Sequence, residues 1–322
     1  MRLYFIVANL AEALMTALLP NSASALQAGR DASESRILIG STSLYARAIG
    51  QGPPVIVLHG GPDFDHGYLL PDLDRLAQTS RLIYYDQRGR GRSADGVRPE
   101  DVTLASDLED IDRVRQHFRL EAPALLGHSW GAVLALEYAL RYPTRVSRLI
   151  LMNPAPVSAS DVAVARKVYL ERLGADMDRQ RAITASGAYQ AGDPEAVAER
   201  YRIHFKPSLK RPQDYEKMMA TMKAGFIRQG AEGIIKARAV EDQLMRDTWE
   251  MAGYDLLPKL RSLRIPTLVI AGDHDFMVEA AKRIAGAIPN AELVTITDCG
   301  HFAFLECGDD VRGAFKTFIR RR

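Results

Sequence analysis

The fold is decided by the stretch ALLGHSWGAVLALEYAL, residues 124–140. Its first three residues are apolar and predict the end of a buried strand, whereas residues 132–140 place apolar side chains at helical spacing. The G-x-S-x-G sequence between them, from Gly127 to Gly131, is typical of a tight strand-to-helix turn in which a Cβ would collide with neighbouring backbone. Such a turn presents Ser129 at a helix N-terminus, where developing negative charge is favoured. We predict that Ser129 is a nucleophile; the alternative is a small-residue turn that only packs the helix on the sheet.

Short apolar runs recur along the chain, and segments of helix-forming composition separate most of them. Continuous apolar strands are typical of a parallel sheet covered by helices on both faces. We therefore predict an α/β fold with a mostly parallel sheet and helices on both faces. The expected strands are residues 37–39, 44–48, 55–58, 82–85, 124–126, 149–152, 267–271 and 293–296.

One long segment, residues 155–263, interrupts this alternation because it contains many helix formers and charges and almost no strand-like run. Within it, Asp193 can cap a helix whose first turn is opened by Pro194. A structureless loop of this length would be unusual in a compact domain. We therefore expect a helical cap, inserted before the penultimate strand, above a core made of residues 31–154 and 264–322.

The composition is that of an ordinary globular protein, since 47% of the 322 residues are hydrophobic and 25% are charged. The formal net charge of +2 is too small to indicate a nucleic-acid partner. The two cysteines, Cys299 and Cys307, exclude a framework of several disulfides and a four-cysteine metal site. We expect two reduced thiols, although one bridge is possible at this spacing. The sequence predicts no metal and no cofactor, and it leaves the oligomeric state open.

The N-terminal segment resembles a secretory signal. Arg2 precedes an apolar run over residues 3–19, and Pro20 and the small residues 21–25 follow it. This pattern predicts cleavage after Ala25 and a periplasmic or secreted protein. The alternative is an extension outside the fold, over about residues 1–30, on a cytoplasmic protein. The run is too short and too polar for a stable membrane span, and no other segment has the composition of one.

A serine nucleophile needs a base, and the base needs an acid that orients it. In folds of this kind the order along the chain is serine, acid, histidine. His301 follows the last predicted strand, which is the place expected for the base. The turn after the preceding strand offers two acids, Asp273 and Asp275. We predict Asp275 as the orienting acid, because the fourth residue of the turn can reach over the strand end, and Asp273 as a brace for the turn.

The tetrahedral intermediate also needs hydrogen-bond donors for its oxyanion. We expect the backbone N–H of Trp130, directly after the nucleophile, to be one of them. The loop after residues 55–58 reads His-Gly-Gly-Pro, and a backbone without side chains can approach a ligand closely there. We predict Gly61 as the second donor and His59 as a structural residue that fixes this loop.

Several of these segments resemble the α/β-hydrolases and, within them, the proline iminopeptidases. The segment HGGP at residues 59–62, with His66 and Tyr68 downstream, is similar to that group, and so are YDQRGRGRS at 85–93 and GHSWG at 127–131. The resemblance covers about residues 36–320, and His128 replaces a glycine of the group's pattern. It implies the α/β-hydrolase fold and a metal-free serine exopeptidase that removes an N-terminal residue, typically proline.

The resemblance weakens in the expected cap, where the acidic motifs that hold the substrate's amino group in the iminopeptidases are not evident. A buried ammonium requires a paired carboxylate. Glu241 and Glu250 are our candidates for substrate binding, with Glu199 and Asp242 as further possibilities, and each has the alternative role of a solvent-facing helix charge.

The predicted reaction is hydrolysis through an acyl-enzyme, with a short peptide or another small molecule as substrate. The first alternative is a carboxylesterase or lactonase for small apolar esters, whose pocket would be lined by apolar cap residues such as Met218, Met219, Met222 and Phe226. A haloperoxidase side reaction would use the same three catalytic residues. A ligand receptor built on a hydrolase scaffold is the alternative that is not an enzyme.

Overall fold

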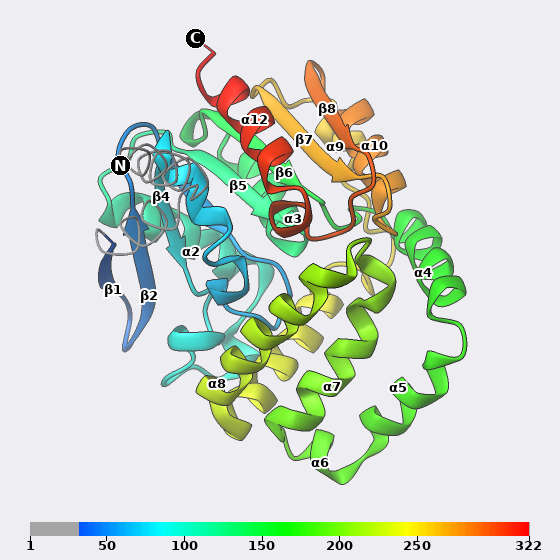
Figure 1. Ribbon diagram of the computed structural model, residues 1–322. Helices are drawn as coiled ribbons and strands as arrows, with labels where there is room; N and C mark the ends of the chain where they lie inside the picture. Colours follow the sequence, from blue (N-terminus) through cyan, green and yellow to red (C-terminus); the bar gives the residue numbers. More distant parts are fainter. Residues whose placement is uncertain (1–31, 322) are drawn as a thin grey trace, which may run out of the picture.

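The computed structural model describes residues 32–321, and its centre is an eight-stranded sheet (Figure 1). The strand order is β1-β2-β4-β3-β5-β6-β7-β8. β1 pairs antiparallel with β2 and β2 antiparallel with β4, whereas all later pairs are parallel. The strands are β1 Ser33–Ile39, β2 Thr42–Ile49, β3 Pro54–Leu58, β4 Arg81–Tyr85, β5 Ala124–His128, β6 Arg148–Met152, β7 Thr267–Gly272 and β8 Ala291–Ile296. The mostly parallel sheet expected from the apolar runs is therefore confirmed.

Alternate residues of the central strands pack into two separate apolar clusters, one on each face of the sheet. Ile56 and Leu125 belong to the cluster that includes α3, whereas Val57 and Leu126 belong to the cluster that includes α12. Both faces are thus covered, which explains why these strands are apolar throughout. The helices outside the insertion are η2 His66–Leu69, η3 Leu73–Gln78, η4 Gly91–Ser93, η5 Pro99–Asp101, α2 Leu104–His117, α3 Trp130–Arg141, η6 Pro143–Arg145, α10 Val278–Ala287, α11 Ala303–Glu306 and α12 Gly308–Ile319.

The segment between β6 and β7 is helical, as predicted. Asp193 caps α7 by accepting a hydrogen bond from the N–H of Ala196 at 2.8 Å, and Pro194 opens the first turn. α8 is interrupted at Gly230, whose φ of 67° is not helical. The helices of the segment are α4 Ala159–Leu173, α5 Asp176–Ala185, α6 Gly187–Gln190, α7 Pro194–Phe205, η7 Lys206–Ser208, α8 Pro212–Asp247 and α9 Leu257–Leu260. Figure 1 shows α4 to α8 gathered at one end of the sheet, where they form the cap of this fold.

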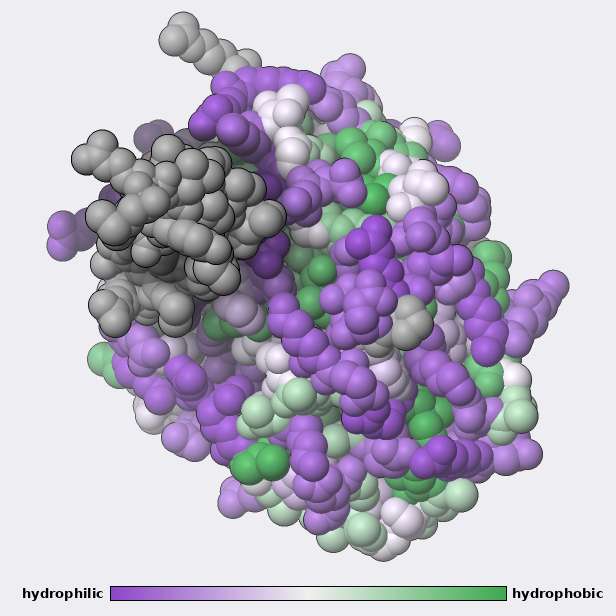
Figure 2. All heavy atoms as spheres, in the orientation of Figure 1, coloured by the Kyte–Doolittle hydropathy of each residue, from purple (hydrophilic) through white to green (hydrophobic). Residues whose placement is uncertain are grey.

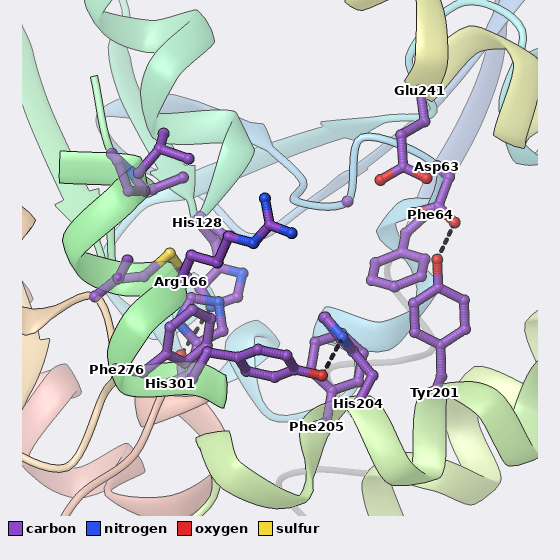
Figure 3. A pocket seen from close by; sticks show the side chains of 18 of the residues that line it. Asp63, Phe64, His128, Arg166, Tyr201, His204, Phe205, Glu241, Phe276 and His301 are labelled. Atoms are coloured by element: carbon purple, nitrogen blue, oxygen red, sulfur yellow. Dashed lines mark hydrogen bonds between the residues drawn. The ribbon is translucent and has the colours of Figure 1, made fainter. Parts of the chain in front are cut away.

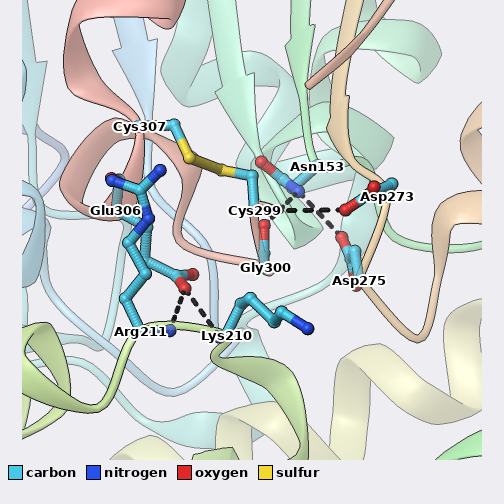
Figure 4. Close-up of a disulfide and its surroundings, with 9 residues drawn as sticks. All are labelled: Asn153, Lys210, Arg211, Asp273, Asp275, Cys299, Gly300, Glu306 and Cys307. Carbon is cyan, nitrogen blue, oxygen red and sulfur yellow. Dashed lines mark hydrogen bonds between the residues drawn. A yellow bond between two sulfur atoms is a disulfide. The ribbon is translucent and has the colours of Figure 1, made fainter. Parts of the chain in front are cut away.

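The expectation of two reduced thiols is wrong, because Cys299 and Cys307 form a disulfide (Figure 4). The chain turns back after β8 and brings the two Cα atoms to 6.3 Å, a separation that a disulfide can span. Both cysteines are buried. The bridge therefore closes a short loop that contains His301.

The surface in the view of Figure 2 is mostly hydrophilic over the described residues, with apolar side chains in small scattered groups. Within residues 32–321, no helix has the length and apolar character needed to cross a membrane. The same part of the chain contains no cluster of histidine, cysteine and acidic side chains suited to a metal ion. The predicted signal segment lies outside the described residues.

Candidate active site

The turn between β5 and α3 holds Ser129 in an unusual backbone conformation, with φ of 54°. Its N–H donates to the carbonyl of Met152 at 3.1 Å, and its carbonyl accepts from Ala155 at 3.1 Å, so neighbouring segments fix the turn. A Cβ on Gly127 would lie 2.3 Å from the carbonyl oxygen of Gly131, and one on Gly131 would lie 2.1 Å from that of Leu58. Both glycines are therefore required by close backbone packing, as the sequence predicted.

His301 and Asp275 meet at the ends of the last two strands. Nδ1 of His301 lies 2.9 Å from Oδ2 of Asp275, and both side chains are almost fully buried. The carboxylate also accepts hydrogen bonds from Asn153 Nδ2 at 2.9 Å and from the N–H of Met277 at 3.0 Å. Burial alone would raise the pKa of Asp275, but the charge and hydrogen bond of His301, together with these two donors, lower it below the usual value. The pair therefore has a negatively charged acid that can orient the imidazole.

Asp273 lies elsewhere in the same turn. Its side chain is exposed and accepts from the N–H of Cys299 at 3.3 Å, so it connects the β7 turn to the loop that carries the histidine. The structure thus brings Asp275, and not Asp273, to His301. Asn153 was not identified from the sequence, because a single asparagine after β6 carries no distinctive local pattern.

The two N–H groups predicted to bind the oxyanion differ from that of Gly60 in their hydrogen bonding. Gly60 donates to the Tyr68 hydroxyl at 2.7 Å, so its N–H is already engaged. Within residues 32–321, the N–H groups of Gly61 and Trp130 donate to no other group. Gly61 has φ of 122°, and a Cβ there would lie 2.5 Å from the N–H nitrogen of Asp63. Both sequence-predicted donors therefore have an N–H group without a partner among the described residues, and Gly61 lines the same cavity as Ser129.

A chain of hydrogen bonds connects the loop of Gly60 to the loop of His301. The Tyr68 hydroxyl accepts from Gly60 and donates to Nδ1 of His128 at 2.7 Å, while Nε2 of His128 donates to the carbonyl of His301 at 3.1 Å. Burial lowers the pKa of His128 to about 3, so the ring is neutral and its single proton is committed to this chain. The sequence showed only that His128 replaces a glycine, and it assigned Tyr68 no role.

His59 is a structural residue, in agreement with the sequence prediction. Its Nδ1 donates to the carbonyl of Gly60 at 2.8 Å, and its Nε2 accepts from the N–H of Gln87 at 3.1 Å. Burial lowers the pKa of His59 to about 3, which leaves the ring neutral. Arg90, in the segment 85–93, is fully buried and pairs with Asp107 at 2.7 Å. This segment therefore has a structural role in holding the neighbouring loops.

A cavity of about 310 Å³ lies between the core and the cap (Figure 3). Ser129 and His301 line it, together with Gly61 of the predicted oxyanion site. Most of the remaining lining residues are apolar or aromatic: Phe64, Tyr68, Ala155, Pro156, Val162, Ala165, Tyr169, Tyr201, Phe205, Met245, Trp249, Phe276, Met277 and Phe302. The lining residues with carboxyl or guanidinium side chains are Asp63, Arg166, Arg200 and Glu241. A cavity that joins a nucleophile, a base and a few charges to an apolar wall fits a small-molecule site.

Asp63 and Glu241 stand together on the wall that faces His301 across the cavity (Figure 3). Asp63 accepts a hydrogen bond from the hydroxyl of Tyr201. Burial and the charge of Asp63 raise the pKa of Glu241 to about 8, although Arg200 lowers it in part. Burial likewise raises the pKa of Asp63. Asp63 was missed in the sequence because it follows the His-Gly-Gly-Pro segment and lies outside the expected cap.

The other sequence candidates for this wall do not reach it. Glu250 is exposed and does not line the cavity, because the chain turns after α8 and directs the preceding Trp249 inward. Nε1 of Trp249 donates to the carbonyl of Pro156 at 2.8 Å. The apolar residues expected of an esterase pocket are buried in the interior of the cap instead: Met218, Met219, Met222 and Phe226.

Known proteins show the same fold and sequence features. Residues 53–306 match the family described as alpha/beta hydrolase fold. Proline iminopeptidase from Saccharolobus solfataricus is 29% identical over 286 residues, which cover 85% of this chain and 86% of that enzyme. The crystal structure of proline iminopeptidase from Mycobacterium smegmatis has a TM-score of 0.65 and 22% identity, over 89% of this chain and 97% of that one. The enol-lactonase from Burkholderia xenovorans LB400 has a TM-score of 0.65 and 20% identity, over 89% and 100%.

The two structural likenesses show the fold alone, because sequence identities of 22% and 20% are too low to indicate a shared activity. The match to the family covers most of the chain and includes the β3 to α11 segment that carries the serine, aspartate and histidine. The chain therefore belongs to the α/β-hydrolase fold family, and it is a hydrolase that resembles the proline iminopeptidases.

Proposed function

We propose that this protein is a serine hydrolase that releases an N-terminal residue, proline or a similar one, through an acyl-enzyme. The observation that supports this substrate class most directly is the acidic wall made by Asp63 and Glu241, which faces His301 across the cavity. A substrate ammonium in an enclosed site requires carboxylate partners, and this wall offers two carboxyl groups. A bound ammonium would favour their charged forms and so lower their raised pKa values. The relatives named proline iminopeptidase support the same class.

In the proposed mechanism, the Oγ of Ser129 attacks the scissile carbonyl carbon, and Nε2 of His301 accepts the hydroxyl proton. Nδ1 of His301 is held by Asp275, so Nε2 is the nitrogen left for this transfer. The N–H groups of Gly61 and Trp130 stabilise the tetrahedral oxyanion. His301 then donates the proton to the leaving amine, and the C–N bond breaks to give the acyl-enzyme. Water attacks the ester with His301 as base, and Ser129 is released.

We assign the cap to residues 155–263, and in this proposal it has two roles. It supplies Glu241 to the acidic wall, and it covers the carboxyl ends of the strands, so that bulk water is largely kept from the reacting carbonyl. The reaction requires no metal or cofactor, because a positioned serine, histidine and aspartate complete the proton transfers among themselves.

The test is paired hydrolysis of a proline arylamide and a short-chain nitrophenyl ester, with Ser129→Ala as the control. We expect rapid arylamide cleavage that is lost in the variant and in a substrate whose proline nitrogen is acetylated. Acetylation removes the positive charge that the acidic wall would bind. Cleavage of the acetylated arylamide as fast as the free one would contradict the proposal.

A carboxylesterase or lactonase is the second candidate. The observation that favours it is the predominantly apolar and aromatic lining of the cavity, which suits a small apolar acyl group. Ser129-dependent cleavage of the ester without any cleavage of the arylamide would establish this alternative.

A further inference from the structure

Arg166 is a cation of the cavity that has no anionic partner in the protein. It lies on α4, lines the cavity, and points into it between His301 and the acidic wall (Figure 3). Within residues 32–321, its guanidinium makes no ion pair within 4.0 Å and no hydrogen bond. By contrast, Arg172 on the same helix donates to the carbonyls of Pro207 and His274.

The other charges of the cavity are already grouped. Arg200 lies near Asp63 and Glu241 and lowers the pKa of both carboxyls, and its guanidinium carbon lies 4.6 Å from the ring centre of Tyr201. His128 and His204 also line the cavity, but burial lowers their pKa values and keeps both rings uncharged. They therefore contribute no charge that could attract or repel a ligand. Within residues 32–321, Arg200 also makes no ion pair within 4.0 Å and no hydrogen bond, but its charge acts on the carboxyls of Asp63 and Glu241. Arg166 is thus the cation of the cavity that the acidic wall does not offset.

A guanidinium has a planar array of donors that matches a carboxylate with two parallel hydrogen bonds. Arg166 is exposed at the edge of the cavity, so water partly screens its charge, and the paired hydrogen bonds give the contact its selectivity. We propose that Arg166 binds a carboxylate of the substrate. Resting on the proposed peptidase function, we identify this group as the free C-terminus of a dipeptide.

In this proposal a dipeptide makes three contacts in the cavity. Its ammonium faces Asp63 and Glu241, its single peptide carbonyl lies at Ser129, and its carboxylate lies at Arg166. The volume of about 310 Å³ supports a ligand of this size, since it lies at the small end of the range for small-molecule sites, which runs from about 300 to about 1,000 Å³. Substrate selection would then depend on both ends of the peptide and not on the amino end alone.

The experiment compares the dipeptide Pro-Gly with Pro-Gly amide, which lacks the negative charge, and includes the proline arylamide as a third substrate. The measured quantity is the ratio of kcat/KM for Pro-Gly to kcat/KM for the amide. We expect this ratio to be about 10 in the unmodified enzyme and to fall about 10-fold, to near 1, in Arg166→Gln, because the exposed position of Arg166 limits the contribution of its hydrogen bonds. Arg166→Lys keeps the charge but loses the paired geometry, and its ratio should lie between the two.

The matched control is Lys167→Gln, which removes the adjacent charge on α4 from a side chain that is exposed and does not line the cavity. Its ratio should equal that of the unmodified enzyme. Arylamide cleavage with equal rates for the dipeptide and its amide would overturn the role of Arg166 and leave the proposed function standing. Absence of Ser129-dependent cleavage of all three substrates would overturn both proposals.

Discussion

Asp275 and Asp273 are two residues apart in the sequence, but their carboxylates have different environments. Asp275 is buried and bonded to His301, Asn153 and Met277, whereas Asp273 is exposed and bonded only to the N–H of Cys299. A proton-transfer role depends on the contact with the imidazole, so the two residues are not interchangeable despite their similar sequence positions.

We expect Asp275→Asn to lower kcat by about 10³ to 10⁴, because an amide neither stabilises the imidazolium nor holds the correct tautomer of His301. Asp273→Asn should change kcat by less than about tenfold, since its side chain only braces a turn. Measurement of kcat for both variants on one Ser129-dependent substrate tests this assignment. Equal losses in the two variants would contradict it.

Glu241 makes the stability of the protein depend on pH. Its pKa is raised to about 8 in the folded state, above the ordinary value of 4.5, so the folded protein retains a proton that the unfolded chain has released. The stabilisation associated with that proton is complete below about pH 4.5 and is lost as the pH rises toward 8. The sign follows from the raised pKa of an acid, which favours the protonated form in the fold.

Glu241→Gln removes this titration, because glutamine is neutral at every pH. We expect the variant to unfold at nearly the same temperature as the unmodified protein at pH 5, and at a higher temperature at pH 8. Glu232→Gln, on an exposed side chain of α8, is the control and should show no such difference. A variant that is less stable at pH 8 than the unmodified protein would show that Glu241 is charged and favourably paired there.

At the scale of elements, the contact between β3 and the start of α3 fixes the position of Ser129. The Cα of Gly131 packs so closely on β3 that an added Cβ would lie 2.1 Å from the carbonyl oxygen of Leu58. The atoms that an added Cβ would meet belong to the backbone of Leu58 and His59, so no flexible side chain could move aside. The helix can therefore begin at this place only with glycine.

We expect Gly131→Ala to lower the free energy of unfolding by about 3 kcal/mol, as overpacking in a core does. The matched control is Gly313→Ala in α12, where an added Cβ meets no atom within 4 Å. There the exchange should raise the free energy of unfolding by about 0.5 to 1 kcal/mol, because alanine favours a helix. Urea unfolding of both variants measures the two effects, and a Gly131→Ala protein as stable as the original would contradict the close packing.

At the scale of the whole molecule, the cap and the core share one apolar interior. Phe64, from the loop after β3, contacts Tyr201, Phe205 and Phe226 of the cap, with ring centres 5.0, 5.9 and 6.3 Å away. The rings of Trp130, in the core, and Trp249, in the cap segment, also meet edge to face at 5.6 Å. Separation of the cap would expose these aromatic surfaces to water, which is unfavourable.

We therefore expect the cap and the core to unfold in one transition. Tryptophan fluorescence reports the contact between Trp130 and Trp249, while far-UV circular dichroism reports the helices of both parts. The two urea transitions should have the same midpoint. A fluorescence change that precedes the loss of helix would instead show that the cap opens independently.

The sequence by itself determined the sheet, the helical insertion, the turn around Ser129 and the pairing of Asp275 with His301. These features depend on local patterns: apolar runs, capping residues, and glycines that a tight turn requires. The conformation of the Gly61 loop follows in the same way, because it is encoded in the loop's own residues, and the role of Gly61 as an oxyanion donor stays a prediction. Local sequence is informative wherever neighbours along the chain set the geometry.

Only the tertiary structure decided which charged residues reach the cavity. It placed Asp63 beside Glu241, directed Glu250 to the surface, and left Arg166 facing the cavity without a partner. It also joined Cys299 to Cys307, contrary to the sequence expectation. These outcomes depend on how the cap helices are rotated and docked on the core, and that arrangement results from packing between segments far apart in the chain, which no local pattern records.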